Sequence, residues 1–266
     1  MPPSFATRYG PWALVTGASS GIGAELARRL GALGLHVVLC ARRKDRLTAL
    51  GAEITARHGV ETLSLEVDLA RPDFLPGLLA GVGDREVGLL VNNAGFGDKG
   101  PFLASDLDMQ LRMLDTNCRA VLILSHTFGR RLAARGRGGM IFTSSTAAFQ
   151  GLPFSSHYAA TKGYDLQLAE GLWYELQRDG IDVVALCPGP TDTEGPRRTG
   201  VDPAKVPVAM MDAASVARAG IEALGRSPLA IPGAANRAVS LLVRLVPRWL
   251  ATRIAGRMVL RVTNLE

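Results

Sequence analysis

The segment that decides the fold of this chain is Ala13-Leu14-Val15-Thr16-Gly17-Ala18-Ser19-Ser20-Gly21-Ile22-Gly23. An apolar run enters a turn that contains three glycines, and a helical pattern leaves it, with Ile22, Leu26 and Leu30 on one stripe. A strand that passes through a glycine turn into a helix is typical of α/β proteins that bind phosphate groups. The helix N-terminus offers such a group free N–H donors and the positive end of the helix dipole.

The three glycines of this turn have separate uses in a dinucleotide site. Gly17 can make the tight turn, Gly21 lets the backbone approach a pyrophosphate, and Gly23 lets the helix lie close to the strand. Their spacing, Gly-x-x-x-Gly-x-Gly, differs from the more common Gly-x-Gly-x-x-Gly. Taken alone, the segment also fits a purely structural turn, so its assignment depends on the rest of the chain.

Short apolar runs alternate with helical patterns along the whole chain. The runs predicted as strands are Trp12–Thr16, His36–Cys40, Thr62–Val67, Leu89–Val91, Met140–Thr143, Asp182–Leu186 and Leu229–Ile231. The clearest predicted helices are Gly21–Leu33, Arg42–His58 and Tyr158–Asp179. Strand–helix–strand alternation implies right-handed crossovers and a parallel sheet covered on both faces. We therefore expect an α/β fold with a single Rossmann-type domain, a doubly wound parallel sheet flanked by helices.

The end of the second predicted strand bears on cofactor choice. A site that prefers NAD usually places an acidic residue here, against the ribose hydroxyls, but residues 36–44 contain no Asp or Glu. The strand leads instead into Arg42 and Arg43, and a guanidinium can bind a 2′-phosphate through two hydrogen bonds. The pattern predicts NADP(H), with Arg42 as the first candidate and Arg43 as the second. The alternative is a solvated first turn of the next helix, although basic residues are unfavourable at a helix N-terminus.

Tyr158 and Lys162 form the clearest catalytic pair. Reduction of a carbonyl group by hydride needs a positioned acid for the developing alkoxide. A phenol is a poor base near neutral pH, and a nearby ammonium group favours the phenolate. The two residues are four apart on a predicted helix and share a face, and the pattern Tyr-x-x-x-Lys occurs once in the chain. An incidental surface pair is the alternative interpretation.

Together these segments resemble the classical short-chain dehydrogenase/reductase family over roughly residues 11–233. Six motifs carry the resemblance in the order of the family: Thr16-Gly17-Ala18-Ser19-Ser20-Gly21-Ile22-Gly23, Val67-Asp68-Leu69, Asn92-Asn93-Ala94-Gly95, Asp115-Thr116-Asn117, Ser144-Ser145 with Tyr158-Ala159-Ala160-Thr161-Lys162, and Pro188-Gly189-Pro190-Thr191-Asp192-Thr193. The resemblance implies hydride transfer between NADP(H) and a carbonyl or alcohol group. The catalytic residues it implies are Asn117, Ser145, Tyr158 and Lys162.

The resemblance also implies the cofactor contacts. The Asp68 carboxylate would face the adenine amino group, Asn93 would support the sheet beside the adenine ribose, and residues 188–193 would flank the nicotinamide. The residues expected to contact the cofactor are Gly17, Ser19, Ser20, Gly21, Ile22, Gly23, Arg42, Arg43, Asp68, Leu69, Asn93, Ala94, Gly95, Tyr158, Lys162, Pro188, Gly189, Thr191 and Thr193. Asn93 could instead only satisfy backbone groups at a strand end, and the threonines could be plain turn residues.

Two further roles concern the substrate and the proton. Ser145 would hold the substrate oxygen and stabilise charge that develops there, with Ser144 as the adjacent alternative. Its separation from Tyr158 matches the family pattern, which favours Ser145. In the family, the residue matching Asn117 holds a water that links the residue matching Lys162 to solvent. The alternative is that Asn117 is only a solvated polar residue on a helix.

Two stretches fall outside the alternation of strands and helices. Residues 194–211, rich in Pro, Gly and Arg, are expected to form a lid, and their Pro, Val and Met content favours an apolar substrate. We assign residues 1–233 to the NADP(H)-binding and catalytic domain and residues 234–266 to a C-terminal helical extension of it. The extension mixes aliphatic residues and Trp with Arg. We expect it to pack as a cap, with a subunit interface or contact with an anionic membrane as alternatives.

The composition is that of an ordinary globular protein, with 47% apolar and 20% charged residues. The net charge of +6 favours anionic ligands, but no dense basic run indicates nucleic acid. Three cysteines without a Cys-x-x-Cys pair fit buried thiols in a reducing compartment, and the four histidines lack metal-ligand spacing, so no metal site is expected. With no signal peptide or membrane span visible, a cytoplasmic protein is expected.

The sequence leaves the substrate open. Apolar ketones, aldehydes and 3-oxoacyl groups all fit, including steroid and xenobiotic carbonyls, and so does either direction of reaction. A nucleotide-sensing regulator on the same fold is the second function to consider, although it would typically lack the Tyr158–Lys162 pair. A membrane-bound scaffold is the third and depends on the C-terminal extension alone. A small-molecule substrate and a homodimer or homotetramer are expected.

Overall fold

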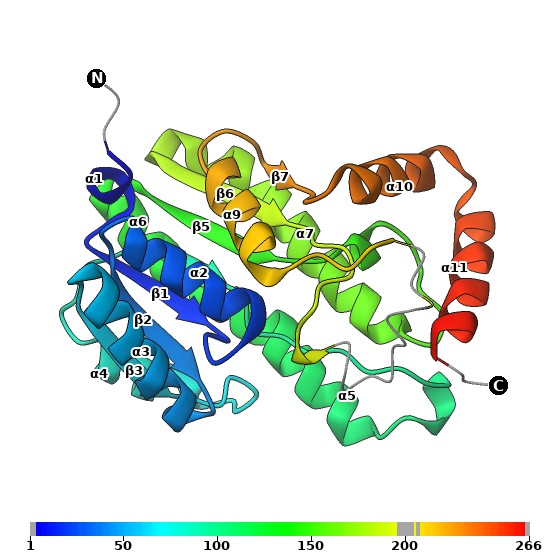
Figure 1. Ribbon diagram of the computed structural model, residues 1–266, viewed down its shortest axis with the longest axis horizontal. Coiled ribbons are helices and arrows are strands. Elements are labelled where there is room, and N and C mark those ends of the chain that lie inside the picture. Colours follow the sequence, from blue (N-terminus) through cyan, green and yellow to red (C-terminus); the bar gives the residue numbers. More distant parts are fainter. Residues whose placement is uncertain (1–3, 196–204, 206–207, 264–266) are drawn as a thin grey trace.

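The centre of the molecule is a seven-stranded parallel sheet in the order β3-β2-β1-β4-β5-β6-β7 (Figure 1). The structure is a computed structural model and describes residues 4–195, 205 and 208–263. The strands are β1 (Trp12–Thr16), β2 (His36–Ala41), β3 (Thr62–Glu66), β4 (Val87–Asn92), β5 (Gly138–Thr143), β6 (Ile181–Leu186) and β7 (Leu229–Ala230). Each predicted strand is present, with ends that differ by a residue or two.

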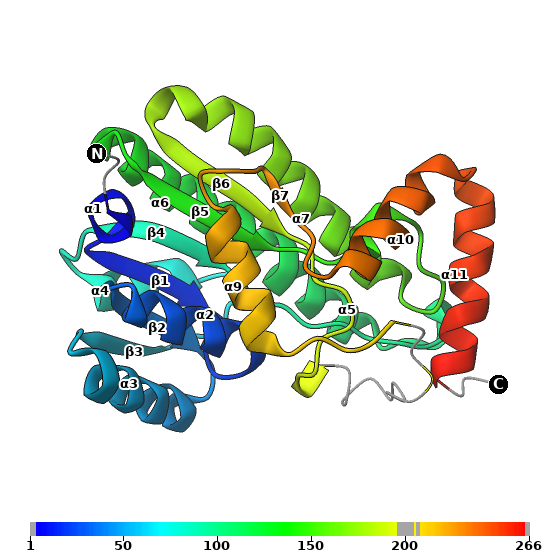
Figure 2. The same cartoon turned by 45° about the horizontal axis from the view of Figure 1, so that its top comes forward.

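Helices cover both faces of this sheet (Figures 1 and 2). The α-helices are α1 (Phe5–Tyr9), α2 (Gly21–Ala32), α3 (Lys44–His58), α4 (Phe74–Val82), α5 (Leu107–Leu114), α6 (Ala120–Arg135), α7 (Ser156–Glu175), α9 (Ala213–Ala223), α10 (Ala234–Leu245) and α11 (Arg248–Thr263). Shorter helical segments are η1 (Phe102–Ala104), η2 (Asp115–Arg119), η3 (Thr146–Phe149) and η4 (Leu176–Asp179), of which η2 is a π-helix.

Two apolar cores lie on opposite faces of the sheet. Side chains from α2, α3 and α9 form one core, and side chains from α4, α6 and α7 form the other. Successive strand residues point to opposite faces, so Val37 of β2 joins the first core and Val38 joins the second. Both valines are fully buried. The prediction of a doubly wound α/β fold is therefore confirmed.

The strand order places the functional end of the molecule. The chain passes from β1 outward to β3 and then returns to β4, so the order reverses between β1 and β4. In open α/β sheets, ligands bind outside the carboxyl ends of the strands at such a reversal. Residues that follow β1, β4, β5 and β6 therefore meet at one edge of the sheet, and these segments carry the sequence motifs.

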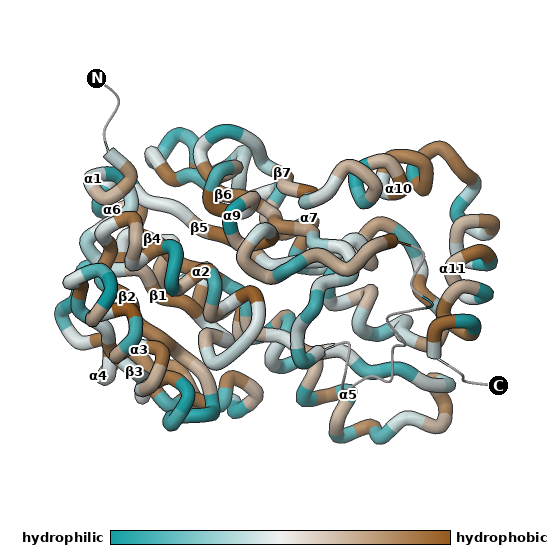
Figure 3. Tube along the Cα trace, in the orientation of Figure 1, coloured by the Kyte–Doolittle hydropathy of each residue, from teal (hydrophilic) through white to brown (hydrophobic). Residues whose placement is uncertain are grey.

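The helices α10 and α11 follow β7 and stand beside this same edge of the sheet (Figures 1 and 2). Figure 3 shows hydrophobic residues along the strands and also on α10 and α11. No helix in the described part of the chain is long and apolar enough to cross a membrane. Of the lid expected at 194–211, residues 196–204, 206 and 207 lie outside the described residues.

All three cysteines are free and buried. Cys40 is the last but one residue of β2, Cys187 follows β6, and Cys118 lies in η2. Burial raises the pKa of each thiol to about 12. Their packing as small apolar side chains agrees with the expectation of buried, reduced thiols.

Candidate active site

In the glycine turn between β1 and α2, neighbouring backbone atoms leave no room for side chains at Gly17 and Gly23. Gly17 has a φ of +67°, a conformation that favours glycine, and a Cβ there would lie 2.8 Å from the Cα of Ala94. A Cβ on Gly23 would lie 2.4 Å from the carbonyl oxygen of Gly17. The helix α2 begins at Gly21 and carries no acidic residue in its first turn. Its N–H groups are therefore accessible to an anion without opposing charge.

Two arginines stand beside this turn, in different environments. The Arg43 guanidinium donates to the hydroxyls of Ser19 (3.0 Å) and Ser20 (2.8 Å) and forms an ion pair with Glu194 at 2.8 Å. Arg46 pairs with the same carboxylate, and the two guanidinium groups lower the pKa of Glu194 to about 2. Arg42 is exposed and makes no ion pair within the described part of the chain. A cation that is free to bind a phosphate therefore stands next to one that already orders the turn.

Hydrogen bonds join the end of β4 to the end of β1. The Thr16 hydroxyl accepts from the backbone N–H of Asn93 (2.9 Å) and of Ala94 (3.0 Å), and the Asn93 side chain donates to the Thr16 carbonyl at 2.9 Å. The Asn93 carboxamide thus supports the sheet, which both interpretations of this residue predicted. The carboxylate of Asp68 accepts from the backbone N–H of Ala70 and pairs with Arg112 at 3.0 Å.

Tyr158 lies in the first turn of α7, with Lys162 one turn further on. Its ring packs against Gly97, in the loop that follows β4. The Lys162 ammonium donates to the carbonyl oxygen of Thr143, at the end of β5, over 2.8 Å. Lys162 is buried and Tyr158 half-buried. The predicted sharing of one helix face therefore places both groups at the same edge of the sheet.

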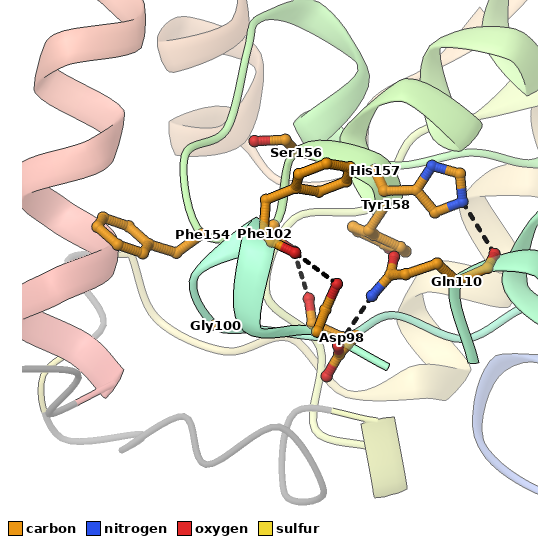
Figure 4. Close-up of a pocket in the computed structure, with 10 residues that line it drawn as sticks. Asp98, Gly100, Phe102, Gln110, Phe154, Ser156, His157 and Tyr158 are labelled. Atoms are coloured by element: carbon orange, nitrogen blue, oxygen red, sulfur yellow. Dashed lines mark hydrogen bonds between the residues drawn. The ribbon is translucent and has the colours of Figure 1, made fainter. Parts of the chain in front are cut away.

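A polar cluster fixes the start of α7 against the loop after β4 (Figure 4). The Ser155 hydroxyl donates to the carbonyl of Asp98 at 2.8 Å, and the Gln110 amide of α5 donates to the Asp98 carboxylate at 3.1 Å. His157 contacts the carbonyl of Gln110 at 3.0 Å. Asp98, Gln110, Ser155 and His157 line one small hollow together with Tyr158, so the start of α7 that carries Tyr158 is held by contacts with the loop after β4 and with α5.

The two adjacent serines after β5 have different partners. The buried Ser144 hydroxyl donates to the carbonyl of Lys162 at 2.7 Å. The Ser145 hydroxyl accepts from the backbone N–H of Ala147 at 3.1 Å, which leaves its own proton free to be donated. Of the two alternatives, Ser145 is therefore the one with an available donor.

Asn117 is fully buried in η2. Its carboxamide accepts from the N–H of Phe96 at 3.1 Å and donates to the carbonyl of Phe96 (2.9 Å) and the hydroxyl of Thr161 (3.0 Å). The alternative of a solvated residue is wrong, because Asn117 is fully buried. The helix expected here includes a π-helix, which inserts an extra residue between α5 and α6. This distortion turns Asn117 inward, toward the residue that precedes Lys162.

The turn after β6 is joined to the C-terminal extension. The side chain of Asn236, at the start of α10, packs against Gly189 and donates to the Pro232 carbonyl at 2.9 Å. The Thr191 hydroxyl donates to the carbonyl of Gly189 at 2.9 Å, within its own turn. Sequence reasoning missed Asn236, because the contact links segments that are far apart in the chain.

One cavity of about 820 Å³ connects these motifs. The predicted residues that line it are Gly17, Ser19, Ser20, Gly21, Ile22, Gly23, Arg42, Arg43, Asp68, Leu69, Asn93, Ala94, Gly95, Ser145, Tyr158, Lys162, Pro188, Gly189, Thr191 and Thr193. Asn117 is the one predicted site residue that is not among the lining residues; it supports the wall from behind. The structure thus brings the predicted residues together.

The far wall of the cavity comes from α10 and α11, and the sequence did not identify these residues. The apolar lining residues of this wall are Val239, Leu242, Val243, Val246, Ala251, Ile254, Ala255, Met258, Val259 and Val262. Tyr158 and Lys162 therefore lie between the glycine turn at one end of the cavity and an apolar wall at the other.

Asp165 is a further residue that sequence reasoning missed. It lies three positions after Lys162 on α7, is buried, and accepts a hydrogen bond from the Lys162 ammonium at 2.9 Å. A carboxylate at this spacing shares a helix face with the lysine, and that signal could have identified it.

Comparisons with known proteins agree with this geometry. The family model described as short chain dehydrogenase matches residues 11–202. The 7beta-hydroxysteroid dehydrogenase of Clostridium sardiniense is 31% identical over 234 residues, 88% of this chain and 90% of that protein. The very-long-chain 3-oxoacyl-CoA reductase of Homo sapiens is 32% identical over 183 residues, 67% of this chain and 59% of that protein. A solved short-chain dehydrogenase from Sphingobium yanoikuyae in complex with NADPH is 34% identical, with a TM-score of 0.80 over 89% of this chain and 94% of that one.

Proposed function

This chain belongs to the short chain dehydrogenase family and is an oxidoreductase of CH–OH and C=O groups, and we propose that it moves hydride between NADP(H) and an apolar ketone, aldehyde or 3-oxoacyl compound. The observation that carries the proposal is the position of Tyr158 and Lys162, one turn apart on α7, in the cavity that begins at the glycine turn. When bound, NADPH supplies the hydride, and the chain supplies binding, orientation and the proton.

The residues present fit a dinucleotide phosphate. The turn at Gly17 and Gly21 brings backbone rather than side chains to the cavity, and α2 begins there without an acidic residue. Arg42 is the exposed cation at the edge of the cavity and would bind the 2′-phosphate. Arg43 orders the Ser19–Ser20 segment of the turn and would help phosphate binding indirectly, by holding these two residues in place.

Tyr158 would donate the proton that the substrate oxygen needs as it takes up charge. Ser145 would donate a hydrogen bond to the same oxygen, since its proton is not used by the protein. Lys162 would hold the nicotinamide ribose and favour the phenolate of Tyr158 by its charge. Asn117 would link Lys162 to solvent through a water, and its contacts with Phe96 and Thr161 support the backbone on either side of that path.

The substrate class follows from the far wall of the cavity. Side chains of α10 and α11 line it with Val, Leu, Ile and Met, and no charged residue from either helix contributes. Such a wall would exclude water from an apolar substrate. Burial of the substrate would then stabilise the complex by about 25 cal/mol for each Å² of apolar surface removed from water. The relatives that act on hydroxysteroids and very-long-chain 3-oxoacyl-CoA support the same size and polarity of substrate. On this basis residues 234–266 are part of the catalytic domain.

The proposal also covers how the protein assembles and where in the cell it is located. We expect a homodimer or homotetramer, and the apolar residues Leu107, Leu111, Leu114 and Leu122 on the surface of α5 and α6 support it. A cytoplasmic location is supported by three free cysteines, which fit a reducing compartment.

A panel of carbonyl compounds, followed by the oxidation of NADPH, tests the proposal. We expect turnover with bulky apolar ketones, 3-oxo steroids or 3-oxoacyl thioesters, and much less with small polar ones such as pyruvate. The reverse reaction, NADP⁺ reduction by the matching alcohols, should proceed with the same selectivity. Tight NADPH binding without turnover of any carbonyl or alcohol would favour the nucleotide-sensing function instead.

A further inference from the structure

The ion pair between Lys162 and Asp165 is buried, and few other polar groups contact it. The ammonium and the carboxylate are 2.9 Å apart, and the two side chains are only 6% and 3% exposed. The Oδ1 atom of Asp165 is buried without a hydrogen-bond partner in the described part of the chain. Burying a charged group is costly unless the group is paired. Burial of the Asp165 carboxylate therefore costs free energy, and its one partner within the described residues is the lysine of the active site.

The pair determines where the lysine points. An ammonium group has three N–H donors. Thr143 accepts one at 2.8 Å and Asp165 accepts a second at 2.9 Å. The third donor remains for the cavity, which Lys162 lines. Without Asp165, the ammonium would be held at one point only and could rotate.

The pair also affects whether the lysine is charged. Burial alone would lower the pKa of Lys162, but Asp165 and Tyr158 beside it raise that pKa above its ordinary value. Burial raises the pKa of Asp165, and Lys162 opposes that shift. Each partner therefore favours the ionised form of the other.

Within the described residues, Asp165 is the one carboxylate that pairs with Lys162. The groups that act on Lys162 are Tyr158 and Asp165 from α7 and Cys118 from η2. Cys187, after β6, faces the same region. Both thiols have a pKa raised to about 12 and stay neutral near pH 7. In the described part of the chain, Lys162 forms no ion pair with any other carboxylate.

We propose that Asp165 is a positioning residue that keeps Lys162 charged and directs its ammonium group into the cavity. The inference rests on the proposed function, in which Lys162 holds the nicotinamide ribose and assists Tyr158. Asp165 touches neither the substrate nor the cofactor and acts through Lys162 alone. Its carboxylate balances the charge of the lysine where both side chains are buried.

The direct test follows the titration of Lys162 itself. The chain contains four lysines, so ¹³Cε-lysine labelling gives four NMR signals, and Lys162→Arg identifies the one to follow. In the unmodified protein we expect Lys162 to keep its proton to above about pH 10.4, the ordinary lysine value. In Asp165→Asn, which keeps the shape and an acceptor oxygen but removes the charge, we expect the titration to move down by about 3 units.

The second readout is function as it varies with pH. For Asp165→Asn, both the affinity for NADP⁺ and kcat/KM should fall above the new titration point, kcat/KM by about tenfold for each pH unit. The unmodified protein should lack this alkaline loss over the same range. Asp182→Asn is the matched control, because Asp182 pairs with Arg8 and Tyr9 away from the cavity. It should lower the melting temperature and leave the pH profile unchanged.

The outcomes separate this proposal from the proposed function. Failure of the unmodified protein to bind NADP(H) or to turn over any carbonyl contradicts the proposed function, whereas the lysine titration tests Asp165 without cofactor or substrate. An identical Lys162 titration in the unmodified protein and Asp165→Asn overturns the positioning role. If Asp165→Asn does not fold, a Lys162 that loses its proton below about pH 9 in the unmodified protein overturns the role equally.

Discussion

At the scale of single residues, Tyr158 is fixed by contacts that leave its hydroxyl for the substrate. Gly97 lies against the ring, and the cluster of Asp98, Gln110 and His157 holds the loop and the helix start that carry it. A side chain held in this way loses little entropy when it enters a reaction geometry. Its chemical role can therefore be tested by a change that leaves the ring in place.

Tyr158→Phe removes the transferable proton and keeps the ring. We expect turnover to fall by about 10²–10⁴-fold, the usual contribution of a positioned acid, while NADP(H) still binds. Tyr174→Phe is the control, because Tyr174 lies on the same helix with its side chain exposed, and it should retain full activity. Steady-state kinetics and cofactor titration measure both variants. Nearly full activity in Tyr158→Phe on a confirmed substrate would contradict the mechanism.

Arg42→Ala removes the cation that has no protein partner within the described residues. NADPH should bind more weakly by about 1–3 kcal/mol, the range for a charge-assisted bond, and NADH should be little affected. Arg57→Ala is the control, since Arg57 lies at the exposed far end of α3. Dissociation constants for both cofactors measure the change. Equal constants for NADPH and NADH in the unmodified protein would remove the basis for the assignment.

The sequence predicted the residues that carry chemistry in a fixed motif, and it did not reveal the residues that act through tertiary contact. Tyr158, Lys162 and the glycine turn are recognisable because their spacing follows from helix and turn geometry. Asn236 is not recognisable, because its partner Gly189 comes from a distant segment. Asp165 lies between the two cases: its helical spacing is visible, but its burial is not.

At the scale of elements, α11 acts as one wall of the cavity. Val259 is buried on its inner face, and the exposed Arg257 lies on its outer face. An aspartate at position 259 would introduce an unpaired charge into that apolar wall, at a cost of several kcal/mol. The helix would then detach from the cavity rather than bury the charge.

Val259→Asp should therefore reduce kcat/KM for bulky apolar substrates by about 10–200-fold, the effect of losing an apolar contact in a pocket. The dissociation constant for NADP⁺ should stay close to that of the unmodified protein, since the glycine turn lies at the other end of the cavity. Arg257→Gln, on the outer face of the same helix, is the matched control and should leave both quantities unchanged. Equal losses with large and small substrates would show that α11 does not select for size.

Secondary structure was predictable where burial is continuous and less so where a tertiary contact overrides local preference. The strands could be located because buried apolar runs mark both their faces. The helix predicted at Arg42 begins at Lys44, since Arg43 leaves the helical conformation and reaches Ser19 and Ser20 instead. The π-helix at η2 could not be predicted, because its extra residue is held by the contacts of Asn117.

At the scale of the whole molecule, two exposed apolar surfaces could meet a second copy of the chain. The surface of α5 and α6 combines Leu107, Leu111 and Leu122 with charges of both signs, which a twofold partner can match. The exposed apolar residues of α11, Trp249, Ile254 and Met258, lie among charged residues that are all arginines, and a twofold contact would place these arginines against each other. We therefore expect self-association through α5 and α6.

Leu111→Glu should convert the assembled protein to a smaller species, because it places a charge in the middle of the α5 surface. Light scattering coupled to gel filtration measures the mass. Leu245→Glu, at a leucine of α10 that is also exposed, is the control and should leave the mass unchanged. The reverse pattern would move the interface to the C-terminal extension.

The labelling rates of the three buried cysteines can report how often parts of the molecule open. A thiol with a pKa of about 12 is ionised in about one molecule in 10⁴ at pH 8, and only the thiolate attacks a labelling reagent. Labelling must therefore wait until Cys40, Cys118 or Cys187 is exposed, so its rate under native conditions measures how often each region opens. Cys40 and Cys187 are fully buried beside the sheet and should report on global unfolding. Cys118 lies in the π-helix behind the cavity wall and should react first, through a local opening that bound NADP⁺ suppresses.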